Sequence, residues 1–123
     1  MPNVERTGIR DSTPSKMRRS FKSDGCYHAD VDMLEERWIK GQRVFVAVCE
    51  YKYNTAASDT QKERTEEIAK RLSHGQSKKC KALIIHYHKH DFESDTYNIT
   101  ELWPEKKQLV LSFEDFRRYI RKL

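Results

Sequence analysis

Short runs of apolar residues, separated by turn-forming and charged positions, are spread along residues 27–123. The strongest run, residues 44–49, is apolar on both faces of an extended strand, with Val44, Val46 and Val48 on one face and Phe45, Ala47 and Cys49 on the other. This pattern predicts a central strand that is covered on both sides. Gly41 lies in the turn before it and tolerates a positive φ, so we expect a long hairpin of residues 27–38 and 43–53.

Helices are predicted before and after this hairpin. Ser58 and Gln61 form a capping-box signal for a helix that reaches about residue 73. Its inward stripe consists of Gln61, Thr65, Ile68 and Leu72. Residues 82–87, 96–103 and 108–111 are expected strands, Ser112 caps a last helix, and residues 13–21 form a short early helix. The order predicts an α/β sandwich, a mixed sheet with a central hairpin flanked by helices.

Length and charge define the organisation of the chain. A chain of 123 residues suits one domain, which we place at residues 23–123 after a basic arm at residues 1–22. The chain has 24 Lys and Arg residues against 19 Asp and Glu residues, a net charge of +5. The basic excess is concentrated in the arm, and such an arm favours polyanions through phosphate contacts and counterion release.

Several classes of protein are disfavoured. The run at residues 44–49 is too short to span a bilayer, and the first residues lack the apolar core of a secretion signal, so the expected location is the cytoplasm. The three cysteines are widely spaced and form no C-x-x-C pair, which argues against a disulfide scaffold or a zinc site. Trp38 and Trp103 are expected in the core or at a partly buried edge.

Charged residues end the predicted central strand. Glu50 and Lys52 continue the face of Val44, Val46 and Val48, and at the end of a buried strand such charges are costly unless they are paired or used. The partner strand carries Asp30 and Asp32. In an antiparallel pair, opposing residue numbers have a constant sum. A three-residue loop at residues 40–42 gives a sum of 82 and places Asp32 opposite Glu50, whereas a loop shifted by one residue places Asp30 there.

Such a cluster suits divalent metal chemistry. Two carboxylates from neighbouring strands form a hard-oxygen site for Mg²⁺ or Mn²⁺, and the main-chain carbonyl of Tyr51 is a further candidate ligand. A metal bound there orients a water molecule and lowers its pKa. Lys52 is then available to hold the attacking water or to stabilise charge on a phosphorane. These groups are the components needed to hydrolyse a phosphodiester.

The residues Asp-Val-Asp-Met-Leu-Glu-Glu-Arg (30–37) and Val-Ala-Val-Cys-Glu-Tyr-Lys (46–52) resemble the PD-(D/E)XK nucleases, the restriction-endonuclease-like superfamily. The resemblance covers about half of the chain, although Val31 stands where the family's name-giving Pro precedes the Asp. It implies that Asp32 and Glu50 bind metal, that Lys52 assists the attack, and that Gln61 on the next helix contributes to catalysis. It also implies a Mg²⁺-dependent deoxyribonuclease.

DNA is the expected partner, and a small domain that covers little of a duplex favours a homodimer. The residues expected to contact nucleic acid are Arg18, Arg19, Lys22, His28, Lys78 and Lys79, together with Lys81 in the same loop. Two alternatives remain open. One is a catalytically inactive nucleic-acid-binding module on the same fold. The other is a metal-binding protein that uses His86, His88 and His90, which alternate along one strand face.

Overall fold

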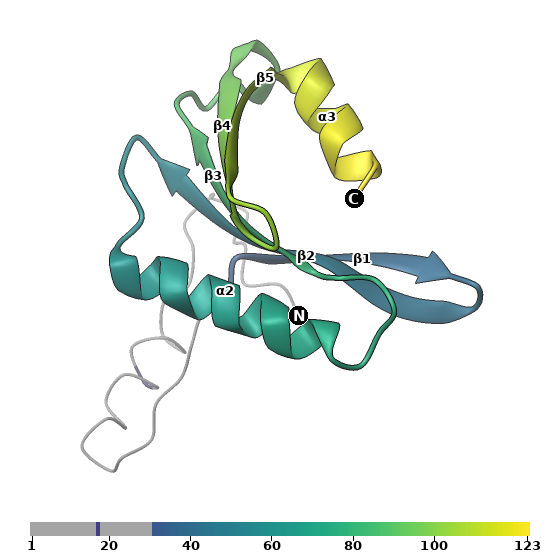
Figure 1. Ribbon diagram of the computed structural model, residues 1–123. Coiled ribbons are helices and arrows are strands. Elements are labelled where there is room, and N and C mark those ends of the chain that lie inside the picture. The colour runs from purple at the N-terminus through teal and green to yellow at the C-terminus, as the bar shows by residue number, and fades with distance from the viewer. Residues whose placement is uncertain (1–16, 18–30) are drawn as a thin grey trace. The chain divides into compact units, whose positions relative to one another are not determined.

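Five strands form one mixed sheet in the computed structural model, which describes Met17 and residues 31–123 (Figure 1). The elements are β1 (Met33–Ile39), β2 (Gln42–Tyr53), α2 (Asp59–Ser73), β3 (Lys81–Tyr87), a short 3-10 helix (Phe92–Ser94), β4 (Thr96–Trp103), β5 (Lys107–Ser112) and α3 (Phe113–Arg121). The strands lie in the order β1-β2-β3-β4-β5. β2 and β3 are parallel and are joined by α2, whereas the other neighbouring pairs are antiparallel. The expected α/β class with a mixed sheet is confirmed.

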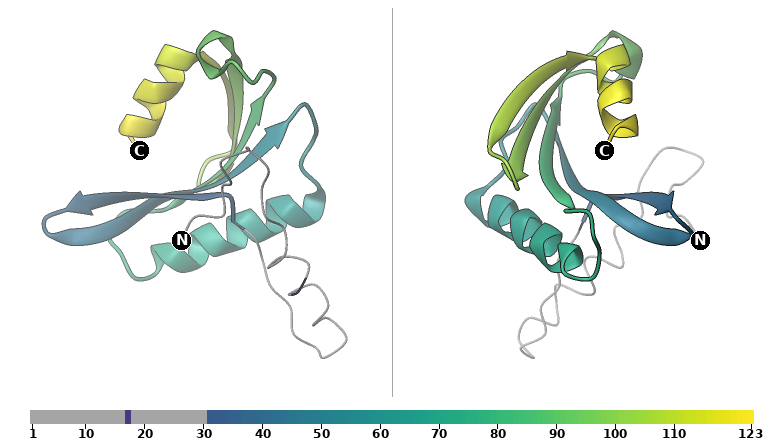
Figure 2. Two further views of the ribbon diagram at one scale, coloured as in Figure 1. Left: turned by 180° about the vertical axis from the view of Figure 1, so that it is seen from behind. Right: turned by 45° about the vertical axis from the view of Figure 1, so that its right-hand side comes forward.

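The two helices cover opposite faces of the sheet (Figures 1 and 2). On the α2 face, Val48 and Ala82 pack against Ala69 of the helix. On the α3 face, a larger core packs against the last helix and contains Cys49, Leu83, Ile85, Tyr97 and Ile99. Burial of apolar side chains on both sides of β2 and β3 is the main force that holds this three-layer arrangement together.

Local sequence signals fix both helix starts. Ser58 Oγ accepts a hydrogen bond from the Gln61 N–H, and Gln61 Oε1 accepts one from the Ser58 N–H, so the predicted capping box is present. Ser112 caps α3 in a similar way, through the N–H of Asp115. These caps satisfy main-chain donors that the first turn of a helix leaves without partners.

The β1–β2 hairpin differs from the sequence prediction in place and in turn. Among the described strands it lies at one edge of the sheet, not at its centre, and β1 is the outermost strand. Lys40 and Gly41 form a two-residue turn with φ values of 50° and 77°, whereas we expected a three-residue loop. Trp38 on β1 is mostly exposed, so its expected place in the core or at a partly buried edge is wrong.

A β-bulge in β2 shifts the alternation of its side chains, so that residues before the bulge project from the opposite face to the one expected from the residues after it. Glu35 pairs with Ala47 and Glu36 pairs with Phe45, which leaves Val46 as the extra residue. Val44 and Val46 therefore pack in the core of the α3 face. The prediction that Glu50 and Lys52 continue the line of Val44 and Val46 is wrong, because after the bulge that line runs only through Val48, on the α2 face.

Residues 1–16 and 18–30 lie outside the described part of the chain. They include most of the predicted arm, the predicted helix apart from Met17, and the start of the first predicted hairpin strand. Residues 31–123 form one compact unit. No helix within the described residues is long and apolar enough to cross a membrane.

Candidate active site

Asp32 comes directly before β1, at the open end of the β1–β2 hairpin. Met33 pairs with Cys49, which sets Asp32 at the level of Glu50. The Tyr51 N–H donates a hydrogen bond of 2.8 Å to Asp32 Oδ2, so the carboxylate takes the place of a main-chain partner in the ladder. This bond holds Asp32 beside the segment that carries Glu50 and Lys52.

Paired residues at this end of the β1–β2 hairpin have numbers that add up to 82, as expected, but for a different reason from the three-residue loop that the sequence predicted. A two-residue turn that joins Ile39 to Gln42 gives a sum of 81, and the bulge at Val46 adds one. The single unpaired residue in β2 therefore restores the sum of 82 over Met33 to Glu35, the register in which Asp32 follows at the level of Glu50. Asp30, the alternative metal ligand, lies outside the described residues.

Glu50 and Lys52 lie half-buried near the end of β2. The parallel pairing with β3 sets Glu50 beside Ile84 and Lys52 beside His86. His86 in turn lies opposite Asn98 of β4. Because paired residues project from the same face of a sheet, Lys52, His86 and Asn98 form a polar row across three strands of the α2 face.

The donor set fits a Mg²⁺ ion that retains water. The N–H and C=O of a strand residue point to the same side, so the Tyr51 carbonyl faces the edge at which its N–H meets Asp32. Within the described residues no three His, Cys, Asp or Glu side chains converge. The groups that could hold such an ion are the Asp32 and Glu50 carboxylates and the Tyr51 carbonyl, and Mg²⁺ usually keeps several waters in such open sites.

Gln61 has a structural task in addition to the one implied by the resemblance. Its Oε1 accepts the Ser58 N–H at 3.0 Å and thereby completes the cap of α2. The Nε2 amide is the part of the side chain that remains for contact with another molecule. As expected for the inward stripe, Gln61 is partly buried, and Thr65 one turn later is fully buried.

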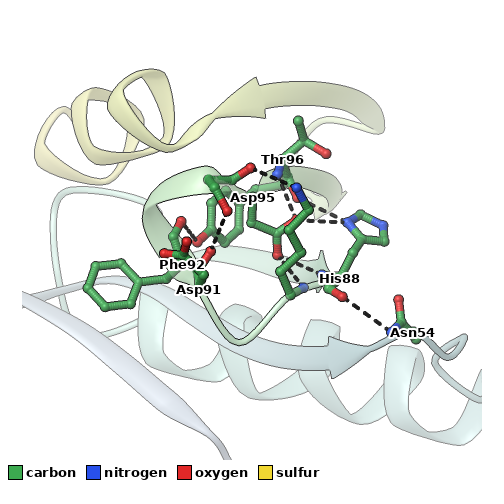
Figure 3. Close-up of polar contacts among 9 residues, drawn as sticks. Asn54, His88, Asp91, Phe92, Asp95 and Thr96 are labelled. Carbon is green, nitrogen blue, oxygen red and sulfur yellow. Dashed lines mark hydrogen bonds and ion pairs between the residues drawn. The ribbon is translucent and has the colours of Figure 1, made fainter.

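The histidines at positions 86, 88 and 90 are not brought together. β3 ends at Tyr87, so only His86 lies on the strand. His88 turns to Asp95, with 3.3 Å between His88 Nδ1 and Asp95 Oδ1 (Figure 3). The His90 ring stacks on Tyr53 with a centroid distance of 4.8 Å.

Asp95 organises this loop, and the sequence reasoning missed it. Its carboxylate accepts main-chain hydrogen bonds from His88, Lys89 and Thr96 at 2.7–2.8 Å (Figure 3). Burial alone raises the pKa of Asp95, but these hydrogen bonds and the contact with His88 outweigh it and lower the pKa from 3.8 to about 2. The only available signal was an Asp directly before a strand, which is too common to be decisive.

Among the predicted nucleic-acid contacts, the described residues Lys78 and Lys79 lie apart from the carboxylates. Lys78 and Lys79 are exposed in the loop after α2, whereas Glu50 and Lys52 precede that helix, whose 15 residues span about 22 Å. Lys81 lies on β3, and its Nζ is 3.2 Å from Oε1 of the buried Glu101. Arg18, Arg19, Lys22 and His28 lie outside the described residues.

The candidate site is an open strand end and not a deep pocket. A hollow of about 470 Å³ lies elsewhere, between α2 and strands β4 and β5, and Asp32, Glu50 and Lys52 do not line it. Small molecules are usually enclosed in hollows of that kind. At the candidate site only Asp32 is exposed, and Glu50 and Lys52 are half-buried beside it.

The two described thiols have no part in this chemistry. Cys49 and Cys80 are fully buried, and burial raises the pKa of Cys49 to about 12 and that of Cys80 to about 11. A protonated, enclosed thiol is a poor nucleophile and a poor metal ligand. Both residues are core side chains.

Comparison of the chain with protein-family models, curated proteins and solved structures gives no match.

Proposed function

We propose that Asp32, Glu50 and Lys52 form the active site of a metal-dependent nuclease that hydrolyses phosphodiester bonds in DNA. The observation that carries this proposal is the 2.8 Å hydrogen bond from the Tyr51 N–H to Asp32 Oδ2. It holds the carboxylate of Asp32, the residue before β1, against the main chain of β2 between Glu50 and Lys52.

Asp32, Glu50 and the Tyr51 carbonyl are the proposed ligands of one Mg²⁺ or Mn²⁺ ion. The bound ion supplies a water of lowered pKa and neutralises charge on the phosphate. Lys52, which follows the ligands on the same face as Glu50, donates hydrogen bonds to the attacking water and to the phosphate oxygen on which charge develops. The Nε2 group of Gln61 is proposed as a further donor at the start of α2.

His86 is proposed as a substrate contact. It lies beside Lys52 in the parallel β2–β3 pair and is partly exposed on the same face. An imidazole N–H at this place can donate to a phosphate oxygen adjacent to the one that Lys52 contacts. Asn98 extends the row by another strand and offers a neutral donor to the next part of the backbone.

DNA is the proposed polymer because the chain is basic and carries exposed lysines outside the proposed active site. The net charge of +5 favours a polyanion, and Lys78 and Lys79 are exposed at the far end of α2. The residues Arg18, Arg19, Lys22 and His28 are proposed as additional phosphate contacts. With the mixed sheet and the Glu-x-Lys strand, these features support a restriction-endonuclease-like assignment within the PD-(D/E)XK nucleases.

The test is cleavage of plasmid and single-stranded DNA with Mg²⁺, with Mn²⁺ and with EDTA. We expect cleavage by the wild-type chain in metal only, and its loss in Glu50→Gln and Lys52→Met. Glu67→Gln, an exposed α2 residue paired with Arg71, is the control and retains activity. Wild-type chain that binds DNA equally in metal and in EDTA without cutting it contradicts the nuclease and supports the inactive DNA-binding module.

A further inference from the structure

The outer edge of β1 has the main-chain groups needed to accept another strand. Within residues 31–123, β2 is the only strand that pairs with β1. Ile39 and Gln42 flank the two-residue turn, and such a flanking pair exchanges main-chain hydrogen bonds. Odd-numbered residues of β1 therefore bond to β2, and the N–H and C=O groups of Leu34, Glu36 and Trp38 point outward. One of the two lone pairs of the Glu36 carbonyl already accepts a 2.7 Å hydrogen bond from Arg37 Nη1.

This edge also exposes large apolar side chains. The exposed fractions are 52% for Met33, 42% for Leu34, 71% for Trp38 and 39% for Ile39. Solvent-facing edge strands are normally short, charged or covered, because an apolar edge invites pairing with another chain. Four such side chains on a seven-residue strand indicate a surface that is covered when the protein functions.

The sequence of β1 is self-complementary when two copies of the strand pair in antiparallel orientation. When the strand Met-Leu-Glu-Glu-Arg-Trp-Ile is laid antiparallel on a second copy with Glu36 at the centre, apolar residues meet apolar residues. Met33 then lies opposite Ile39, and Leu34 lies opposite Trp38. The acidic Glu35 lies opposite the basic Arg37, twice, so that the 3.6 Å ion pair that these two residues form within each chain would extend across the interface. A two-fold axis requires this kind of self-complementarity, whereas an unrelated partner does not.

We propose that the chain forms a homodimer in which β1 pairs antiparallel with β1 of a second copy about a two-fold axis at Glu36. The two five-stranded sheets then join into one continuous sheet. The two Glu36 carboxylates approach at the axis, but each is already paired with Arg43 of its own chain at 2.9 Å. This interface does not depend on the proposed nuclease activity.

A second copy fits this edge better than nucleic acid does. The centre of the strand carries the carboxylates Glu35 and Glu36, which repel phosphate and match the Arg37 side chain of a reversed copy. A perpendicular two-fold axis keeps the α2 faces of both copies on one side of the joint sheet. Asp32 lies four residues from the axis, so the two candidate sites stand about 26 Å apart on that side, at about 3.3 Å per residue.

Molar mass measured by light scattering during gel filtration of the full chain tests the dimer. We expect a wild-type mass of twice 14.7 kDa. In Trp38→Glu the dimer dissociation constant is expected to rise by about tenfold or more, because large aromatic residues dominate such interfaces. Val110→Glu is the matched control, since Val110 is also 71% exposed but lies on β5, at the opposite edge. It should leave the mass unchanged.

Disulfide trapping in a Cys26→Ser background, which keeps the buried Cys49 and Cys80, tests the register. Opposite residues of paired strands are close enough for a disulfide. Glu36→Cys is expected to form a covalent dimer with itself, and Leu34→Cys is expected to link only to Trp38→Cys when the two are mixed. A wild-type chain that stays monomeric overturns the proposal. A dimer that Val110→Glu dissociates and Trp38→Glu does not would also overturn it. Formation of covalent dimers by Leu34→Cys alone to the same extent as by Glu36→Cys alone would exclude the proposed register.

Discussion

The main-chain N–H of Tyr51 donates to the carboxylate of Asp32 at 2.8 Å, although the two residues are 19 positions apart. The backbone of β2 thus positions the proposed metal ligand that directly precedes β1. A main-chain donor cannot be moved by a rotamer change, so one carboxylate oxygen is held in place before metal arrives. Preorganisation of this kind lowers the cost of assembling a metal site.

Asp32→Asn separates the charge of this side chain from its hydrogen bond. The amide oxygen of Asn still accepts the Tyr51 N–H, so we expect the melting temperature to stay near that of the wild type. The neutral amide is a poor ligand for Mg²⁺, and cleavage should fall by about 100-fold or more. Asp115→Asn, at an exposed pair with Arg118, is the control. Wild-type cleavage rates in Asp32→Asn would exclude Asp32 as a ligand.

Lys52 and His86 should affect different steps. Lys52→Met removes a donor to the transition state, and we expect the cleavage rate of bound DNA to fall by about 100- to 1,000-fold with metal affinity unchanged. His86→Asn removes a ground-state phosphate contact, so DNA binding in EDTA should weaken while the rate at saturation changes little. Single-turnover cleavage and binding titrations measure the two effects. A reversed pattern would exchange the proposed roles.

Much of the fold follows from local patterns because those patterns act over a few residues. The capping box of Ser58 and Gln61 places the start of α2 correctly, and residues 96–103 form a strand with the predicted bounds. The bulge at Val46 was not predictable. Val44, Val46 and Ala47 are all apolar, so the run suits either face, and only tertiary packing decides which of them meets α3.

The sequence indicates which residues form the candidate site more securely than it indicates how they are arranged. Glu50 and Lys52 stand out because charges follow a buried run, which is a local signal. The position of Asp32 depends on a turn and a bulge whose effects on the register offset each other. Lys52 and His86 are neighbours because β2 and β3 pair in parallel, and these strands are connected through α2. The periodicity of residues along the chain carries no information about the register of such a pair.

Gln61→Glu tests whether this side chain acts beyond its helix cap. Glu is an effective capping-box residue, so the free energy of unfolding should stay close to that of the wild type. Gln61→Ala loses the bond to Ser58 and should destabilise the chain by about 1 kcal/mol. If the Nε2 amide assists cleavage, Gln61→Glu should cut DNA about tenfold more slowly. Unchanged cleavage with retained stability would leave Gln61 a purely structural role.

The exposed lysines after α2 should contribute to affinity and not to the chemical step. Replacement of Lys78 and Lys79 by Ala is expected to weaken DNA binding for all sequences and to reduce the slope of log affinity against log salt by about 2. Lys40→Asn removes one charge at the β1–β2 turn, where a positive φ suits Asn, and serves as the control. Fluorescence anisotropy across a salt series measures the slopes, and identical slopes would remove Lys78 and Lys79 from the DNA path.

Asp95 should make stability depend on pH in the acid range. Hydrogen bonds from His88, Lys89 and Thr96 lower its pKa from 3.8 to about 2, so the folded state favours the charged form more than the unfolded state does. The resulting stabilisation is complete above the unfolded pKa of 3.8 and is lost as pH falls through about 2.

Asp95→Asn should therefore melt at a lower temperature than the wild type at neutral pH, and the difference should shrink as pH falls from 4 towards 2. Asn offers a single side-chain acceptor oxygen in place of the two that Asp95 uses for His88, Lys89 and Thr96, and it carries no charge. Thermal melts of both chains across that pH range measure the effect, and Asp91→Asn, an exposed neighbour in the same loop, is the control. A melting-temperature difference that stays constant down to pH 2 would show that the carboxylate charge is not what stabilises this loop.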